Sequence, residues 1–176
     1  MLVHFKRSST MNDKVKELWE GMQKKLPNFN CILYPDGTIT VLDFYRFYDS
    51  NENIYYFTIS ALCDTTLDSV LKYDDDPWVL VDEWCVISND MGIFLSGDGA
   101  MGNDGFVAHT DCDGKLKWAM FFNQTNPIKD LEINNNYLIG ISEHNDAKIE
   151  INLKQLTDIK FTYIKTKQSD NCSQSK

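Results

Sequence analysis

The sequence predicts a mainly β, α+β fold, in which a large antiparallel meander sheet forms a sandwich or a propeller-like arrangement and carries an N-terminal amphipathic helix. Three observations predict it. The 176 residues are 43% hydrophobic and 12% aromatic, which is enough for one sizeable core. From residue 31 onward, short runs rich in β-branched and aromatic residues alternate with turn sequences of Gly, Asn and Asp. The strongest 3.6-residue period lies near the N-terminus.

The N-terminal helix is predicted to begin at Asn12 and to stop before Pro27, because a proline cannot continue a helix. Its apolar residues recur at i, i+3, i+4, i+7 and i+11 and so form one stripe: Val15, Leu18, Trp19, Met22 and Leu26. A second, short helix is predicted at 65–73, with Asp64 as its N-cap.

Eleven strands are predicted, and most of their connections are short enough for antiparallel hairpins. They lie at 31–34, 38–44, 54–62, 78–88, 93–96, 106–110, 115–122, 131–133, 137–142, 147–152 and 159–164. We expect a single β-rich domain over residues 11–165. The polar, aperiodic ends are expected to be a flexible extension at 1–10 and a disordered tail at 166–176.

The formal charge of −9 is distributed unevenly along the chain. Residues 1–29 contain 6 basic and 3 acidic residues, residues 30–125 contain 4 and 16, and residues 126–176 contain 7 and 7. The acidic middle segment would repel nucleic acid and an anionic membrane surface, and it would attract a basic protein. Solubility alone is the alternative explanation of this charge. No apolar run is long enough to span a membrane.

Five cysteines show no CxxC pair, and the basic residues near the N-terminus have no apolar stretch behind them. An odd number of cysteines without a signal peptide is typical of reduced thiols, so we expect a cytoplasmic protein. Cys31, Cys63 and Cys85 lie in apolar surroundings and are expected to be small core residues.

The sequence GDGAMG at 97–102 matches the dinucleotide motif GxGxxG, but a strand rather than a helix is predicted to follow it. We interpret the segment from Gly97 to Gly105 as a flexible loop. An alternative function, a β-rich enzyme or small-ligand-binding domain, would use this loop over a pocket.

Other signs of chemistry are weak. The sequence DCDG at 111–114 opens like a calcium loop but lacks the later ligands, so a hairpin turn is preferred. The three histidines show no metal-ligand spacing. We therefore expect no catalytic residues, no metal and no cofactor.

The remaining candidate is an acidic surface. Asp74, Asp75, Asp76, Asp82 and Glu83 surround Trp78 and Trp84. Asp82 is either a buried acid with a partner or part of a contact surface, and the two tryptophans are either core residues or contact residues. A second acidic and aromatic group consists of Asp43, Tyr45, Tyr48, Asp49 and Glu52. Aromatic rings beside carboxylates suit recognition of a protein rich in Arg and Lys.

Residues 105–153 contain GKLKW at 114–118, the pair Phe121-Phe122, NPI at 126–128 and a series of short strands. In these features the segment resembles small bacterial immunity proteins, which neutralise polymorphic or contact-dependent growth-inhibition toxins. The resemblance implies a protein that does no chemistry and binds one cognate toxin, often a basic nuclease.

On this interpretation we expect the partner-binding residues to be Asp74, Asp75, Asp76, Trp78, Asp82, Glu83, Asp98 and Asp104. A third hypothesis is a structural or sensor domain of a larger assembly, which would use the basic N-terminal segment as its contact.

Overall fold

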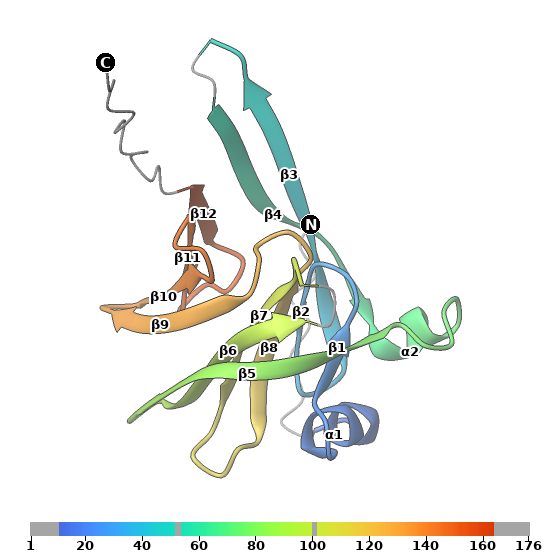
Figure 1. Ribbon diagram of the computed structural model, residues 1–176. Helices are drawn as coiled ribbons and strands as arrows, with labels where there is room; N and C mark the ends of the chain where they lie inside the picture. Colours follow the sequence, from blue (N-terminus) through green and yellow to red (C-terminus); the bar gives the residue numbers. More distant parts are fainter. Residues whose placement is uncertain (1–10, 52–53, 100–101, 164–176) are drawn as a thin grey trace, which may run out of the picture.

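Figure 1 shows the computed structural model, which describes residues 11–51, 54–99 and 102–163. The predicted extension at 1–10 and the predicted tail at 166–176 lie outside the described residues. Strands dominate, and the prediction of a mainly β fold with a large antiparallel sheet is confirmed. No helix in the described part of the chain is long and apolar enough to cross a membrane.

The larger sheet has eight strands, and every neighbouring pair is antiparallel. In spatial order the strands are β1 (Lys25–Pro27), β5 (Trp78–Asn89), β6 (Gly92–Gly99), β7 (Gly105–Thr110), β8 (Leu116–Phe122), β2 (Cys31–Leu33), β3 (Thr38–Asp49) and β4 (Ile54–Thr66). The four consecutive strands β5 to β8 form a meander, as the short turns of this segment predict.

The smaller sheet is a four-stranded antiparallel meander of β9 (Ile128–Asn134), β10 (Tyr137–Ser142), β11 (Ala147–Asn152) and β12 (Ile159–Tyr163). β9 lies against β5 and β6, and β12 lies against β4. The contact with β4 is aromatic, because the rings of Phe44 and Phe57 pack against Phe161, and Phe57 also stacks on Tyr163.

Two apolar clusters use opposite faces of the larger sheet, as alternation along β8 illustrates. Phe121 belongs to the cluster that includes the N-terminal helix, whereas its neighbours Met120 and Phe122 belong to the cluster beneath the smaller sheet. Successive side chains of a strand point to opposite faces, so a strand buried on both sides must be apolar along its length. The near-continuous apolar sequence of β8 meets this requirement.

The first helix, α1 (Asp13–Glu20), is shorter than the sequence predicts. Asn12 caps it and accepts hydrogen bonds from the backbone N–H groups of Lys14 and Val15 at 2.9 and 3.3 Å. The helix ends before Gly21, and Leu26 reaches the same apolar cluster from strand β1. The helical period in the sequence therefore includes residues of a helix and of a strand, because both elements bury apolar side chains in the same cluster.

The second helix, α2 (Leu67–Leu71), begins two residues later than predicted, and its N-cap is Thr66. The prediction of Asp64 as the cap is wrong, because Asp64 lies in β4 and accepts a hydrogen bond from the Thr40 hydroxyl at 2.7 Å. A loop that contains the three consecutive aspartates then connects α2 to β5.

The hairpin of β3 and β4 is the longest in the molecule, and its distal half extends away from the rest of the larger sheet (Figure 1). Tyr45, Phe47 and Tyr48 are exposed on β3, and the rings of Tyr45 and Phe47 stack at 6.2 Å. Part of the second acidic and aromatic group from the sequence analysis therefore lies on this hairpin. The side chains of Asp49 and Glu52 lie outside the described residues.

Candidate functional site

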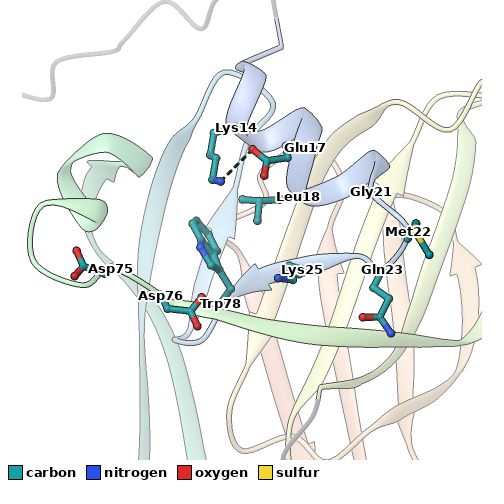
Figure 2. A pocket seen from close by; sticks show the side chains of 10 residues that line it. All are labelled: Lys14, Glu17, Leu18, Gly21, Met22, Gln23, Lys25, Asp75, Asp76 and Trp78. Carbon is teal, nitrogen blue, oxygen red and sulfur yellow. Dashed lines mark hydrogen bonds and ion pairs between the residues drawn. The ribbon is translucent and has the colours of Figure 1, made fainter.

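A groove of about 940 Å³ lies between α1 and the segment that leads into β5 (Figure 2). It is bordered by α1 and the chain that follows it on one side and by the aspartate loop on the other. Its lining residues are Lys14, Glu17, Leu18, Gly21, Met22, Gln23, Lys25, Asp75, Asp76 and Trp78. Three of the eight residues predicted for partner binding therefore line one concavity.

Trp78 is the central aromatic residue of this groove. Its half-buried side chain packs against the apolar cluster that contains Leu18, and Figure 2 shows its ring pointing toward Leu18 and Lys14. Met22 lines the groove as well and is fully exposed to solvent. A half-buried tryptophan and an exposed methionine give the groove an apolar surface that a partner side chain can cover.

Negative charge surrounds this apolar surface. Asp74, Asp75 and Asp76 are exposed, and the Asp74 carboxylate accepts a hydrogen bond from the Asp76 backbone N–H at 3.1 Å. Glu17 is paired with Lys14 at 3.0 Å, as the dashed line in Figure 2 marks. Among the described residues, no basic group forms an ion pair with the three aspartates, so their charges face solvent.

Unlike the three aspartates, Glu83 forms an ion pair. Its carboxylate binds the Lys24 ammonium at 2.6 Å, and both side chains are 32% exposed. Lys24 also lies over the Trp19 ring, 5.5 Å from its centroid. Glu83 therefore offers less free charge to a partner than the three aspartates do, since Lys24 already pairs with it.

Asp82 and Asp98 occupy directly opposite positions on β5 and β6. Asp82 is exposed, whereas one carboxylate oxygen of Asp98, Oδ1, is buried and has no hydrogen-bond partner. Burial raises the pKa of the Asp98 carboxyl, and the negative charges of Asp104, Asp82 and Glu143 raise that pKa further. Like charges opposite each other in a sheet repel, so this pair costs stability.

Asp104 precedes β7 and is only 5% exposed. Burial raises the pKa of its carboxyl as well. The carboxylate lies over Gly99, where an added Cβ would lie 2.8 Å from the Asp104 Cβ and 3.3 Å from Oδ2. A side chain at residue 99 would occupy the space that Asp104 now fills.

Asp82, Asp98 and Glu143 are called the acidic strip below; Asp104 lies on the opposite face of the sheet, beside Gly99. The sequence pattern indicated the two aspartates but not Glu143, because residues 143–146 have the composition of a turn. Its position follows from the packing of the smaller sheet, where the Glu143 backbone N–H donates to the Pro127 carbonyl at 2.8 Å. No local pattern could have indicated this contact.

The sequence left open whether Asp82 is buried and whether Trp78 and Trp84 are core residues, and the exposure of these side chains decides both questions. Asp82 is not a buried acid, because its side chain is exposed. Trp84 is 46% exposed and does not belong to either apolar cluster, whereas Trp78 packs against one of them. The hypothesis of two core tryptophans is therefore wrong for Trp84.

The described residues of the motifs with weak signals lie in strands and turns. Gly97 and Gly99 belong to β6, so the expected loop begins later than predicted. Residues 111–114 form a turn in which the Asp111 carboxylate accepts from the backbone N–H groups of Asp113 and Lys115, both at 2.9 Å. No group of metal-ligating side chains is found in residues 11–51, 54–99 and 102–163.

His109 and the cysteines are positioned by structural contacts. The imidazole of His109 stacks on Phe94 at 4.1 Å, and its Nε2 lies 3.0 Å from the Met91 carbonyl oxygen. Cys31 is buried, and burial raises the pKa of its thiol. Cys63 is exposed and Cys85 is half-buried, so the expectation of core positions is wrong for Cys63 and only partly met by Cys85.

Comparison of the chain with protein-family models, with curated proteins and with solved structures gives no match. Its function is therefore inferred from the chemistry of its surface.

Proposed function

We propose that this chain is a bacterial immunity protein, which binds a cognate basic toxin in the cytoplasm and blocks it through an acidic surface. The two sheets act as a sandwich-like scaffold for that surface. The toxin is expected to be nuclease-like, since a nuclease must carry positive charge where it holds the phosphate backbone. The immunity protein itself needs no catalytic residue, metal or cofactor.

The observation that carries the proposal is the groove with its unpaired aspartates. Asp74, Asp75 and Asp76 are exposed without an ion-pair partner among the described residues, and the last two line the groove together with the half-buried ring of Trp78. Rigid aromatic side chains supply most of the binding energy in many protein interfaces. Carboxylates around them accelerate the encounter with a basic partner.

The groove alone is smaller than a complete protein interface. A stable protein interface buries roughly 800 Å² on each partner, which is more than one groove supplies. The exposed Met22 and the outer surface of β5, including Asp82 and Trp84, would extend the contact. In this arrangement the groove supplies the anchor and the surrounding carboxylates supply long-range attraction.

The first experiment is affinity capture from the native host with the full chain as bait. Candidate proteins are identified by mass spectrometry, and each is expressed with and without this chain. The proposal requires a captured basic protein that arrests growth when expressed alone and is harmless when the chain is co-expressed. If no captured protein is toxic, or if the chain does not relieve its toxicity, the proposal is rejected.

A charge-reversal variant then tests the groove. Asp74→Lys/Asp75→Lys/Asp76→Lys should slow association at least about tenfold at low salt, because it replaces attraction by repulsion. The matched control is Asp90→Lys/Asp130→Lys/Glu132→Lys, which changes the net charge equally at exposed positions outside the groove. Equal slowing in both variants would mean that net charge matters and the groove does not.

A further inference from the structure

Strand β5 has a backbone edge that is uncovered along most of its length. β1 covers this edge only as far as Leu80, and the Val81 backbone N–H then donates to the Lys24 carbonyl at 3.1 Å. Beyond this point β5 is bonded to β6 on one side, and no described residue bonds to its backbone on the other. Figure 1 shows β5 continuing past the short β1. Residues 82–89 are called the open edge below.

The open edge is apolar at its centre and accessible to solvent. Trp84 and Val86 are 46% and 56% exposed, and Cys85 and Ile87 are half-buried. About half of the backbone N–H and C=O groups of such a strand point outward, because successive residues direct these groups to opposite sides. The open edge therefore offers a partner both hydrogen-bonding groups and apolar surface.

A comparison with β9 shows that the open edge lacks the usual protection. β9 is also an edge strand, and it carries Lys129 and the exposed Asp130 and Glu132. Natural proteins guard their sheet edges with charged residues, above all lysine, and with proline. Residues 82–89 contain no lysine, arginine or proline, and a bulge bends the strand only near its acidic start.

The acidic residues of this segment disfavour a second copy of the chain as the occupant. Asp82 and Glu83 begin the open edge, and Asp90 follows its end. Two copies paired antiparallel around Val86 would place Asp82 of one opposite Asp90 of the other. Like charges directly opposite each other destabilise a strand pair, and each copy has a formal charge of −9. A basic strand would be attracted instead.

The chain's own residues beside β5 show which side chains suit this edge. Lys24, directly before β1, binds the Glu83 carboxylate at 2.6 Å. Asp82 is the next residue along β5; it is exposed and has no ion-pair partner among the described residues. A strand that continued the line of β1 could bring a second cation beside Asp82.

We propose that the open edge accepts an extended basic strand of a protein partner, which adds to the larger sheet antiparallel to β5. Backbone hydrogen bonds hold this strand, a lysine or arginine bonds Asp82, and apolar side chains cover Trp84 and Val86. The identity of the partner as a toxin rests on the proposed function. Trp78 of the groove begins β5, so the groove and the open edge lie along one strand.

The test uses the full chain and two synthetic peptides, the basic Ac-KVTVTVKV-NH2 and the acidic Ac-EVTVTVEV-NH2. Amide hydrogen exchange followed by NMR measures the protection of residues 82–89. In the free protein the outward amides should exchange quickly, and saturating basic peptide should slow their exchange at least about tenfold. The acidic peptide should give no such protection, because Asp82 and Glu83 repel it.

A variant localises the binding. Val86→Lys places at an exposed position of the open edge the residue that guards natural edges, and should weaken binding of the basic peptide at least about fivefold. The matched control, Ser60→Lys, adds the same charge at an exposed position of β4 and should not weaken it. Thermal unfolding verifies that both variants are folded.

Three outcomes of these measurements would overturn the inference. They are an absence of protection at residues 82–89, protection that persists unchanged in Val86→Lys, and equal binding of the acidic peptide. A fourth is a dimer of the wild type in analytical ultracentrifugation that Val86→Lys dissociates, since this would assign the open edge to a second copy.

The proposed function and the open edge fail separately. Absence of peptide binding would reject the open edge without rejecting the toxin contact, because toxin capture and the groove variant are measured without the peptide. Specific protection by the basic peptide together with failed toxin capture would support the open edge and reject the proposed function.

Discussion

The two acidic regions of the molecule handle their charge in opposite ways. Around α1, carboxylates face lysines: Lys14 binds Glu17, and Lys24 binds Glu83. In the acidic strip, Asp98 lies opposite Asp82, and the neighbouring charges that raise its pKa are all negative. The paired carboxylates near α1 therefore cost little stability in the free protein. Repulsion among the carboxylates of the strip lowers the free energy of unfolding. The difference indicates that repulsion between carboxylates lowers stability mainly in the strip.

The largest effect is expected from breaking the backbone arrangement that supports the strip. A Cβ added at Gly97 would overlap the Asp82 carbonyl oxygen and lie 2.9 Å from the Trp84 backbone nitrogen. Since both atoms belong to the backbone of β5, neither can move without disturbing the sheet. Gly97→Ala should therefore lower the free energy of unfolding by about 3 kcal/mol, measured by urea denaturation.

Ser88→Ala is the control for Gly97→Ala, because Ser88 is exposed on β5, the strand against which Gly97 of β6 packs. It should change the free energy of unfolding by less than about 0.5 kcal/mol. A Gly97→Ala protein as stable as the control would contradict the close approach of Gly97 to the backbone of β5.

The second effect tests the apolar part of the groove. Trp78→Ala removes a half-buried ring that packs against the apolar cluster of α1, and should cost about 2 kcal/mol of stability. Trp84→Ala removes a ring that is 46% exposed and should cost less. Thermal and urea unfolding of the two variants side by side measure the difference, and a larger loss for Trp84 would contradict the described packing.

The third effect has the opposite sign, because it relieves repulsion. Asp98→Asn should raise the free energy of unfolding by about 0.5–1 kcal/mol at pH 7. The pKa of Asp98 is raised above the 3.8 of an unperturbed aspartate, so the folded state binds protons more tightly than the unfolded state. The wild type therefore loses stability as pH rises from 3.8 through the raised pKa.

The advantage of Asp98→Asn should accordingly be largest above the raised pKa of Asp98 and vanish below pH 3.8. Urea denaturation across this pH range measures it. Asp113→Asn, at an exposed turn, is the control and should show no comparable change. A variant less stable than the wild type at pH 7 would mean that Asp98 makes a favourable contact in the free protein.

Local sequence patterns predicted the strands of β5 to β8 well, because each turn contains its own signal, such as Gly92 or Gly114 at positive φ. The end of α1 was missed, since Leu26 continues a helical period while lying in a strand. The groove and the strip depend on contacts between distant segments. Glu143 affects Asp98 only because the smaller sheet packs against the larger one, and no spacing in the sequence encodes that.

The smallest effect comes from the ion pair of Lys24 and Glu83. Glu83→Gln should lower the free energy of unfolding by only about 0.5 kcal/mol, because both side chains are partly exposed and water screens the pair. The loss should shrink further in high salt, where Asp98→Asn should also lose part of its benefit. Urea denaturation in low and high salt measures both. If Glu83→Gln instead stabilised the protein as Asp98→Asn should, the contrast between paired and unpaired acidic regions would be wrong. A small loss at one site and a gain at the other would establish that the lysines near α1 neutralise their carboxylates, while the carboxylates of the strip repel one another in the free protein.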